Sequence, residues 1–180
     1  ETFTTLSGKL VAIKIFYQKE HVGKAKHALM CIKKAMAWDE INYGREYDLD
    51  VLNIVAVDDF NAGAMENKGL NIFNSKYILN DDDTSTDSDF ALTEAIIAHE
   101  YFHNWTGNRV TCRDWFQLCL KEGLTVFREQ EYTEDQLEKE ISRINQTDFL
   151  IKNQFKEDAG PLSHSARPTR YREINNFYTA

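Results

Sequence analysis

The chain has 180 residues, of which 42% are hydrophobic and 12% aromatic, so it can build a buried core and is not globally disordered. Acidic residues outnumber basic ones by 29 to 21, and the net charge of -8 disfavours a nucleic-acid-binding surface. No apolar run approaches the roughly 20 residues that cross a bilayer, which argues against a membrane span. Cys31, Cys112 and Cys119 lack CxxC spacing and favour free thiols in a reducing, cytoplasmic compartment.

The first half of the chain predicts strands around one helix. Lys9 to Tyr17 alternates and is rich in β-branched residues, which predicts a strand. Val22 to Tyr43 carries apolar residues at helical spacing and is followed by Gly44, which predicts a helix that ends there. Val51 to Val57 and Leu70 to Phe73 are short apolar runs, and we expect both to join one sheet.

A polar loop from Asn80 to Asp89 separates this sheet from a helical half. Phe90 to Trp105 predicts a buried helix, and Trp115 to Tyr132 predicts a second one. The segment Thr133 to Gln136 has the form of a capping box and should start a third helix, which continues through Ile144. Strands followed by helices indicate an α+β fold with the helices packed at one end of a sheet.

The segment His99 to His103 reads HEYFH and is an HExxH motif inside a predicted helix. Two histidines four residues apart are separated by about 40° around the helix axis, so both rings can reach one ion. Glu100 can contact a water held by that ion without binding the ion itself. A purely structural role for the histidines is disfavoured, because imidazoles without partners are costly to bury.

A third ligand should come from elsewhere, because zinc hydrolases commonly combine three protein ligands with a water. Glu122 is the obvious candidate, since it follows His103 by nineteen residues on the next predicted helix. A helix, turn and helix of that length can return a side chain to the metal. Taken alone, a glutamate on a helix is more often a solvated surface residue.

The HExxH motif, the spacing to Glu122 and the upstream segment Gly63-Ala64-Met65-Glu66-Asn67 together resemble the M1 family of zinc aminopeptidases, gluzincins related to thermolysin. The wider context is similar to the aminopeptidase N (alanyl aminopeptidase) branch of that family. The segments that carry this likeness are Val57 to Phe60, Lys68 to Asn74, Asn104 to Thr111 and Arg113 to Gln117.

This resemblance implies a thermolysin-like catalytic domain with a small mixed sheet followed by helices, present here in part. Residues 1–80 would form the sheet-containing half, 88–150 the helical zinc-binding half, and 151–180 the start of the remainder. It further implies an N-terminal β-domain and C-terminal helical domains of the parent chain that are missing here. An oxyanion-stabilising tyrosine is expected beyond Ala180, and Tyr178 is expected to be a packing residue.

The resemblance also implies roles for single residues. His99, His103 and Glu122 would hold one zinc ion per chain, and Glu100 would act as the general base. Glu66 would bind the α-ammonium of peptide substrates with a free N-terminus, which places the first carbonyl at the metal. The substrate-binding segment as a whole would comprise Gly63, Ala64, Met65, Glu66 and Asn67.

Other residues of the same region have smaller expected roles. The backbone at Gly63 and Ala64 would form an edge strand beside a bound peptide, with a simple turn as the alternative. Three further side chains, Asn104, Arg109 and Asp114, would order the metal-binding helix and the loop that follows it. The remaining histidines have no ligand-like partners at useful spacing and are expected to be surface residues: His21, His27 and His164.

Two alternatives to an aminopeptidase remain open at this point. A zinc epoxide hydrolase of the same superfamily shares the zinc signature but usually carries Gly-Gly where this chain has Gly63-Ala64. A catalytically silent, zinc-stabilised scaffold fragment is disfavoured, because structural zinc sites are closed by four protein ligands. In such a scaffold Glu100 would have no purpose.

Overall fold

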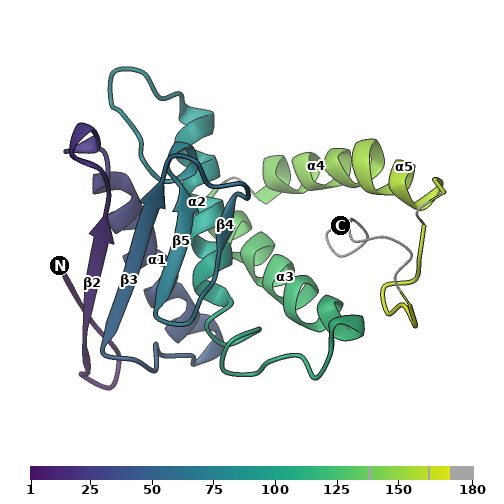
Figure 1. The fold of residues 1–180 in the computed structure, drawn as a ribbon, viewed down its shortest axis with the longest axis horizontal. Helices are drawn as coiled ribbons and strands as arrows, with labels where there is room; N and C mark the ends of the chain where they lie inside the picture. Colours follow the sequence, from purple (N-terminus) through teal and green to yellow (C-terminus); the bar gives the residue numbers. More distant parts are fainter. Residues whose placement is uncertain (138, 162, 171–180) are drawn as a thin grey trace.

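The computed structural model describes residues 1–137, 139–161 and 163–170 (Figure 1). Tyr178 and the tyrosine expected beyond Ala180 lie outside this part. Within it, five strands form one sheet in the order β1-β2-β3-β5-β4. The strands are β1 Thr2–Thr4, β2 Leu10–Phe16, β3 Val51–Val57, β4 Ala64–Met65 and β5 Leu70–Asn74.

The sheet is mixed, with a parallel centre and antiparallel edges. Strands β2, β3 and β5 are parallel, and Ala12 pairs with Val51 across the first of these ladders. Parallel neighbours need a crossover, which helix α1, Lys26–Tyr43, provides between β2 and β3. As predicted, α1 ends at Gly44, whose φ of 62° is left-handed and therefore suited to glycine.

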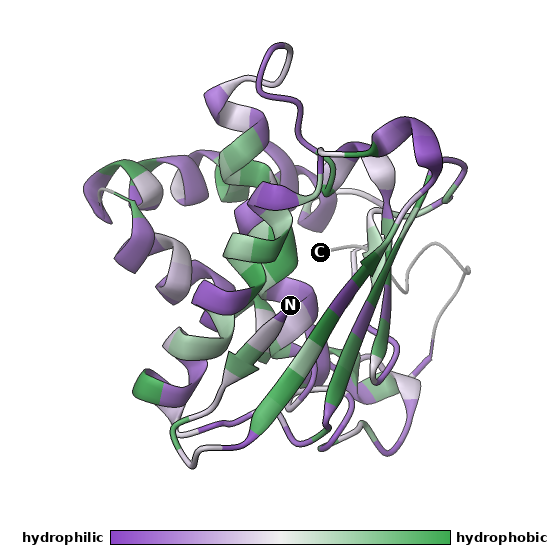
Figure 2. Cartoon of the chain, turned by 90° about the vertical axis from the view of Figure 1, so that its left-hand side faces the viewer, coloured by the Kyte–Doolittle hydropathy of each residue, from purple (hydrophilic) through white to green (hydrophobic). Residues whose placement is uncertain are grey.

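The core lies between the sheet and two helices, α1 and α2 (Asp87–Phe102). Every second residue of β3 is buried, namely Leu52, Ile54 and Ala56. Both helices cover the same face of the sheet (Figures 1 and 2). The predicted α+β fold with a mixed sheet followed by helices is confirmed. Helices α1 and α2 lie on a face of the sheet rather than at its end, and α1 must pack there because it connects two parallel strands.

Helix α2 begins and ends three residues earlier than the predicted Phe90 to Trp105. Thr86 and Asp89 form a reciprocal capping box that starts the helix at Asp87. At the other end the helix stops at Phe102, and His103 is its C-cap. The second histidine of the motif therefore lies at the end of the helix rather than inside it.

Beyond α2, a 3-10 turn at Trp115–Gln117 leads into helix α3, Leu118–Gln136. The predicted start of a helix at Thr133 is wrong. The Thr133 hydroxyl donates to Glu129 at 3.0 Å inside α3, so it continues a helix instead of capping one. The chain goes on through α4 (Lys139–Phe149), a π-helical turn (Leu150–Gln154) and α5 (Phe155–Asp158), which extend away from the sheet (Figure 1). No helix among the described residues combines the length and apolar character needed to span a bilayer.

One buried ion pair joins the three long helices. Arg128 of α3 donates through Nη2 to Asp39 of α1, and both side chains are buried. Its Nη1 donates to the carbonyl oxygen of Phe102, the last residue of α2, at 3.1 Å. The guanidinium thus satisfies a carbonyl at the α2 terminus, close to the histidine motif.

We predict that Asp39→Ala lowers the free energy of unfolding by about 3–5 kcal/mol, because it leaves the Arg128 charge buried without its partner. Asp148→Ala removes the partner of Lys152 in an exposed pair on the far helices and should change stability very little. Chemical denaturation of both variants measures the difference. Equal losses in the two variants would show that the buried pair does not stabilise the helical layer.

Candidate active site

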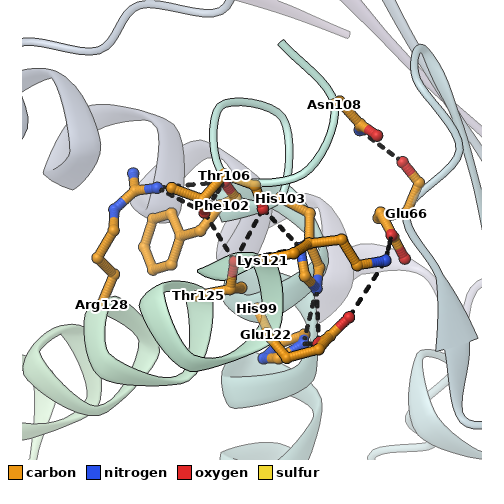
Figure 3. A network of polar contacts seen from close by, with 10 residues as sticks. All are labelled: Glu66, His99, Phe102, His103, Thr106, Asn108, Lys121, Glu122, Thr125 and Arg128. Carbon is orange, nitrogen blue, oxygen red and sulfur yellow. Dashed lines mark hydrogen bonds and ion pairs between the residues drawn. The ribbon is translucent and has the colours of Figure 1, made fainter. Parts of the chain in front are cut away.

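Three side chains that could bind a metal meet where the end of α2 faces α3 (Figure 3). The Nε2 atoms of His99 and His103 lie 3.0 Å apart. The Oε2 atom of Glu122, from α3, lies 3.4 Å from the first and 3.2 Å from the second. These three ligand atoms all lie within 4.8 Å of one another. The structure therefore brings together the three residues that the sequence selected as ligands.

Hydrogen bonds fix the ring of His103. Its Nδ1 lies 2.9 Å from the carbonyl oxygen of Thr106 and 3.1 Å from the hydroxyl of Thr125. A carbonyl oxygen can only accept, so Nδ1 carries the proton and donates it. The lone pair of a neutral His103 is then on Nε2, which points at His99 and Glu122. This arrangement of the second ring nitrogen is typical of histidines that bind metals.

Glu122 presents a charged oxygen to the two imidazoles. Burial raises the pKa of this carboxyl, but contacts from His103 and His99 and the charge of Lys121 outweigh it, and the pKa lies well below its usual range. Thr125 follows three residues later on the same face of α3, which is why it reaches the other side of His103. The register of α3 thus positions both groups.

Glu100 is buried beside this cluster. It is 8% exposed, and its Oε2 has no hydrogen-bond partner among the described residues. Burial raises the pKa of Glu100 to about 7, with His99 and His103 opposing that rise. The result is a carboxyl group that can exchange a proton near neutral pH.

The segment from Gly63 to Asn67 lies at the edge of the sheet. Ala64 and Met65 form β4, which pairs with β5 on one side and is the last strand on the other. Ala64 lies in an edge strand as expected, whereas Gly63 lies in a bend just before it. The expected pairing with a bound peptide stays a prediction. Glu66 directly follows the strand and is 7% exposed, whereas Gly63 and Asn67 are exposed.

Lys121 connects this edge to the histidine cluster, and sequence reasoning missed it. Its ammonium group contacts Oε1 of Glu66 and lies 3.2 Å from Oε1 of Glu122 (Figure 3). Burial opposes the charge of Lys121, but Glu66 and Glu122 outweigh that effect and raise its pKa. The sequence offered only one indication, that Lys121 is the neighbour of Glu122. Adjacent residues on a helix do not face the same way, so this indication was weak.

Asp48 supports the segment after α2 and was also missed. It accepts from Asn104 at 3.1 Å, from Lys68 at 2.6 Å and from Arg109 at 3.3 Å. Asn104 and Arg109 therefore hold the chain after α2, as expected. Asp114 instead accepts from the backbone of the following 3-10 turn at 3.1 Å.

His27 has ligand-like neighbours, so the expectation that it has none is wrong. Its Nε2 lies 3.2 Å from the Cys31 sulfur, and Glu94 completes a group that could hold a metal. The sequence indicated this contact through the spacing of four residues between His27 and Cys31 on α1. Glu94 already accepts from Lys34 at 3.1 Å and Tyr132 at 2.7 Å, and burial raises the pKa of the Cys31 thiol to about 12. These contacts favour a hydrogen-bonded packing cluster.

The other two histidines behave as side chains with local contacts. His21 is half-buried and lies 3.0 Å from a carboxylate oxygen of Asp58. The Nδ1 atom of His164 lies 2.9 Å from the carbonyl oxygen of Ser165. Neither belongs to a group of metal-ligating residues within the described ranges.

Gly107 gives Lys121 room to pass over His103. A Cβ atom at this position would lie 2.8 Å from Cγ of Lys121, and its φ of 138° already disfavours other residues. We predict that Gly107→Ala lowers the free energy of unfolding by about 1–3 kcal/mol. Gly123→Ala, in an exposed part of α3 with nothing within 4 Å of the added atom, should raise it by about 0.5–1 kcal/mol. Thermal and chemical denaturation would contradict this account if both changes had the same sign.

Comparison with known proteins identifies several relatives. The chain is 57% identical over 180 residues to aminopeptidase N of Caulobacter vibrioides and 56% identical over 179 residues to aminopeptidase N of Escherichia coli. These alignments cover 100% and 99% of the chain but only 21% of each relative. The chain thus spans about a fifth of the length of these proteins. Relatives with these names give the epoxide hydrolase alternative no support.

Structure comparison points the same way. The crystal structure of Legionella pneumophila aminopeptidase A in complex with aspartic acid matches with a TM-score of 0.85 and 33% sequence identity, over 99% of this chain and 20% of that one. The model of the peptidase family M1 domain matches residues 27–180. The chain belongs to peptidase family M1.

Proposed function

We propose that the chain forms the zinc-binding part of a metallo-aminopeptidase, which removes N-terminal residues from peptides. One observation carries this proposal. The Nε2 atoms of His99 and His103 and a carboxylate oxygen of Glu122 face one another at 3.0–3.4 Å. Since no two of these atoms can hydrogen bond when both rings present lone pairs, the arrangement favours a cation between them.

The residues fit a zinc ion. A tetrahedral ion with bonds of about 2.0–2.1 Å separates its ligand atoms by about 3.3–3.4 Å, close to the spacings found here. Two imidazoles and a carboxylate are a common ligand set of catalytic zinc, which keeps a further position open. When bound, zinc would supply Lewis acidity and activate a water as the nucleophile.

Glu100 suits the role of general base. Its unpaired Oε2 is free to accept a proton from the attacking water, and a carboxyl whose burial places its pKa at about 7 can pass that proton on to the leaving amine. Its buried position excludes bulk water from the transfer. This use would also explain why an unpaired carboxyl oxygen persists in the interior.

Glu66 and the β4 edge suit the binding of a peptide with a free N-terminus. Within the described part of the chain, β4 has no strand partner on its other side, and its backbone there can pair with an extended peptide. A carboxylate at the end of that strand would stop the peptide by pairing with its α-ammonium, so that only the first peptide bond reaches the metal. The order of β4, Glu66 and the histidine cluster therefore supports an exopeptidase.

The proposal concerns the longest natural form of the protein. Relatives of about five times this length contain further segments, and we propose that a β-domain before this part and helical domains after it complete the substrate site. A silent zinc scaffold is the remaining alternative.

We predict that the longest natural form hydrolyses an alanyl amide and binds about one zinc ion per chain. Glu100→Gln should lower kcat about 100-fold or more because it removes the base, while the zinc content stays unchanged. Glu157→Gln, at an exposed site on α5, is the matched control and should leave both unchanged. Zinc analysis and amide hydrolysis measure these outcomes. A zinc-loaded protein that cleaves no N-terminal amide would contradict the proposal and favour the scaffold.

A further inference from the structure

The ammonium group of Lys121 bridges two carboxylates that belong to different parts of the site. It contacts Oε1 of Glu66 at the sheet edge and lies 3.2 Å from Oε1 of Glu122 on its own helix. The lysine side chain is 13% exposed and that of Glu66 is 9% exposed, so water screens this contact weakly. In Glu122 the other oxygen, Oε2, faces the two histidines (Figure 3).

The loop after α2 fixes the path of this side chain. Gly107 allows the stem of Lys121 to pass, because a Cβ there would lie 2.8 Å from Cγ and 3.0 Å from Cδ of the lysine. The next residue, Asn108, donates to the backbone carbonyl oxygen of Glu66 at 2.7 Å. The same turn thus guides the lysine and holds the strand end that carries its partner.

We propose that Lys121 is a positioning residue that orients both carboxylates. By holding Oε1 of Glu122, it directs Oε2 toward the two histidines as a single metal ligand. By holding Oε1 of Glu66, it leaves the second oxygen for the ammonium group of a substrate. The second half of this inference rests on the proposed aminopeptidase function, and the first half needs only metal binding.

Electrostatics gives the reason for such a residue. Glu66 and Glu122 both contact the ammonium group of Lys121, so the two carboxylates lie near each other across this cation. Like charges at this range repel one another, and without a cation Glu66 and Glu122 would turn apart. Lys121 removes this repulsion before either metal or substrate arrives. The site is then preorganised, which lowers the cost of binding.

The test compares Lys121→Met, which keeps the length and removes the charge, with Lys121→Arg, which keeps a cation. Both are made in the longest natural form, and zinc affinity is measured by competition with a chelator. We expect the methionine variant to bind zinc about 10-fold more weakly, as is typical when a partner of a metal ligand is lost. The arginine variant should retain more of the affinity. Lys152→Met, which breaks the exposed ion pair with Asp148, is the control and should bind zinc normally.

Kinetics with an alanyl amide tests the second half. Lys121→Met should raise KM about 10-fold with a smaller change in kcat at saturating zinc, because Glu66 loses its orientation but Glu100 does not. An equal or lower KM in Lys121→Met would overturn this second half, since Lys121 would then not help to build the amine site. If the methionine variant does not fold, Lys121→Gln provides the same comparison.

The two readouts separate this inference from the proposed function. Zinc affinity can be compared among the variants even if the parent protein cleaves no amide. A parent that binds zinc without hydrolysis would refute the aminopeptidase assignment while the role of Lys121 toward Glu122 is still measured. Equal zinc affinity in the parent and Lys121→Met would refute the positioning role toward Glu122 whatever the activity.

Discussion

The convergence of three electron-pair donors is the constraint on which the site depends. Nδ1 of His103 donates to the carbonyl oxygen of Thr106, so in a neutral ring the lone pair on Nε2 faces His99 and the charged oxygen of Glu122. Three such atoms repel one another unless a cation lies between them. The surrounding structure holds them together nonetheless, as the proposed metal site requires.

Contacts on both sides of the histidine motif hold these atoms in place. Helix α2 stops at Phe102, whose carbonyl oxygen is bound by Arg128, and Arg128 is itself anchored to α1 through Asp39. On the other side of the motif, Asp48 gathers three donors from the following segment and from the strand connection. The end of α2 is therefore fixed by the buried ion pair of Arg128 on one side and by the hydrogen bonds of Asp48 on the other.

Local patterns predicted much of this structure, and tertiary contacts explain the rest. The strand Val51–Val57 has the bounds expected from its apolar run, because burial and alternation are both written in the sequence. The spacing of His99, His103 and Glu122 in the sequence also predicted that these three residues meet. The prediction of a helix start at Thr133 fails because helix α3 continues past it. The contact of its hydroxyl with Glu129 is not visible in the local pattern. Lys121 could not be found, since its partner Glu66 lies 55 positions away in the chain.

X-ray absorption at the zinc edge of the loaded, longest natural form tests the central claim most directly. The account predicts only nitrogen and oxygen neighbours at about 2.0–2.1 Å, with the scattering of two imidazoles. A sulfur neighbour at about 2.3 Å would contradict it. That result would place the ion at a cysteine, as in the group of His27, Cys31 and Glu94, and not between the two helices that carry His99 and Glu122.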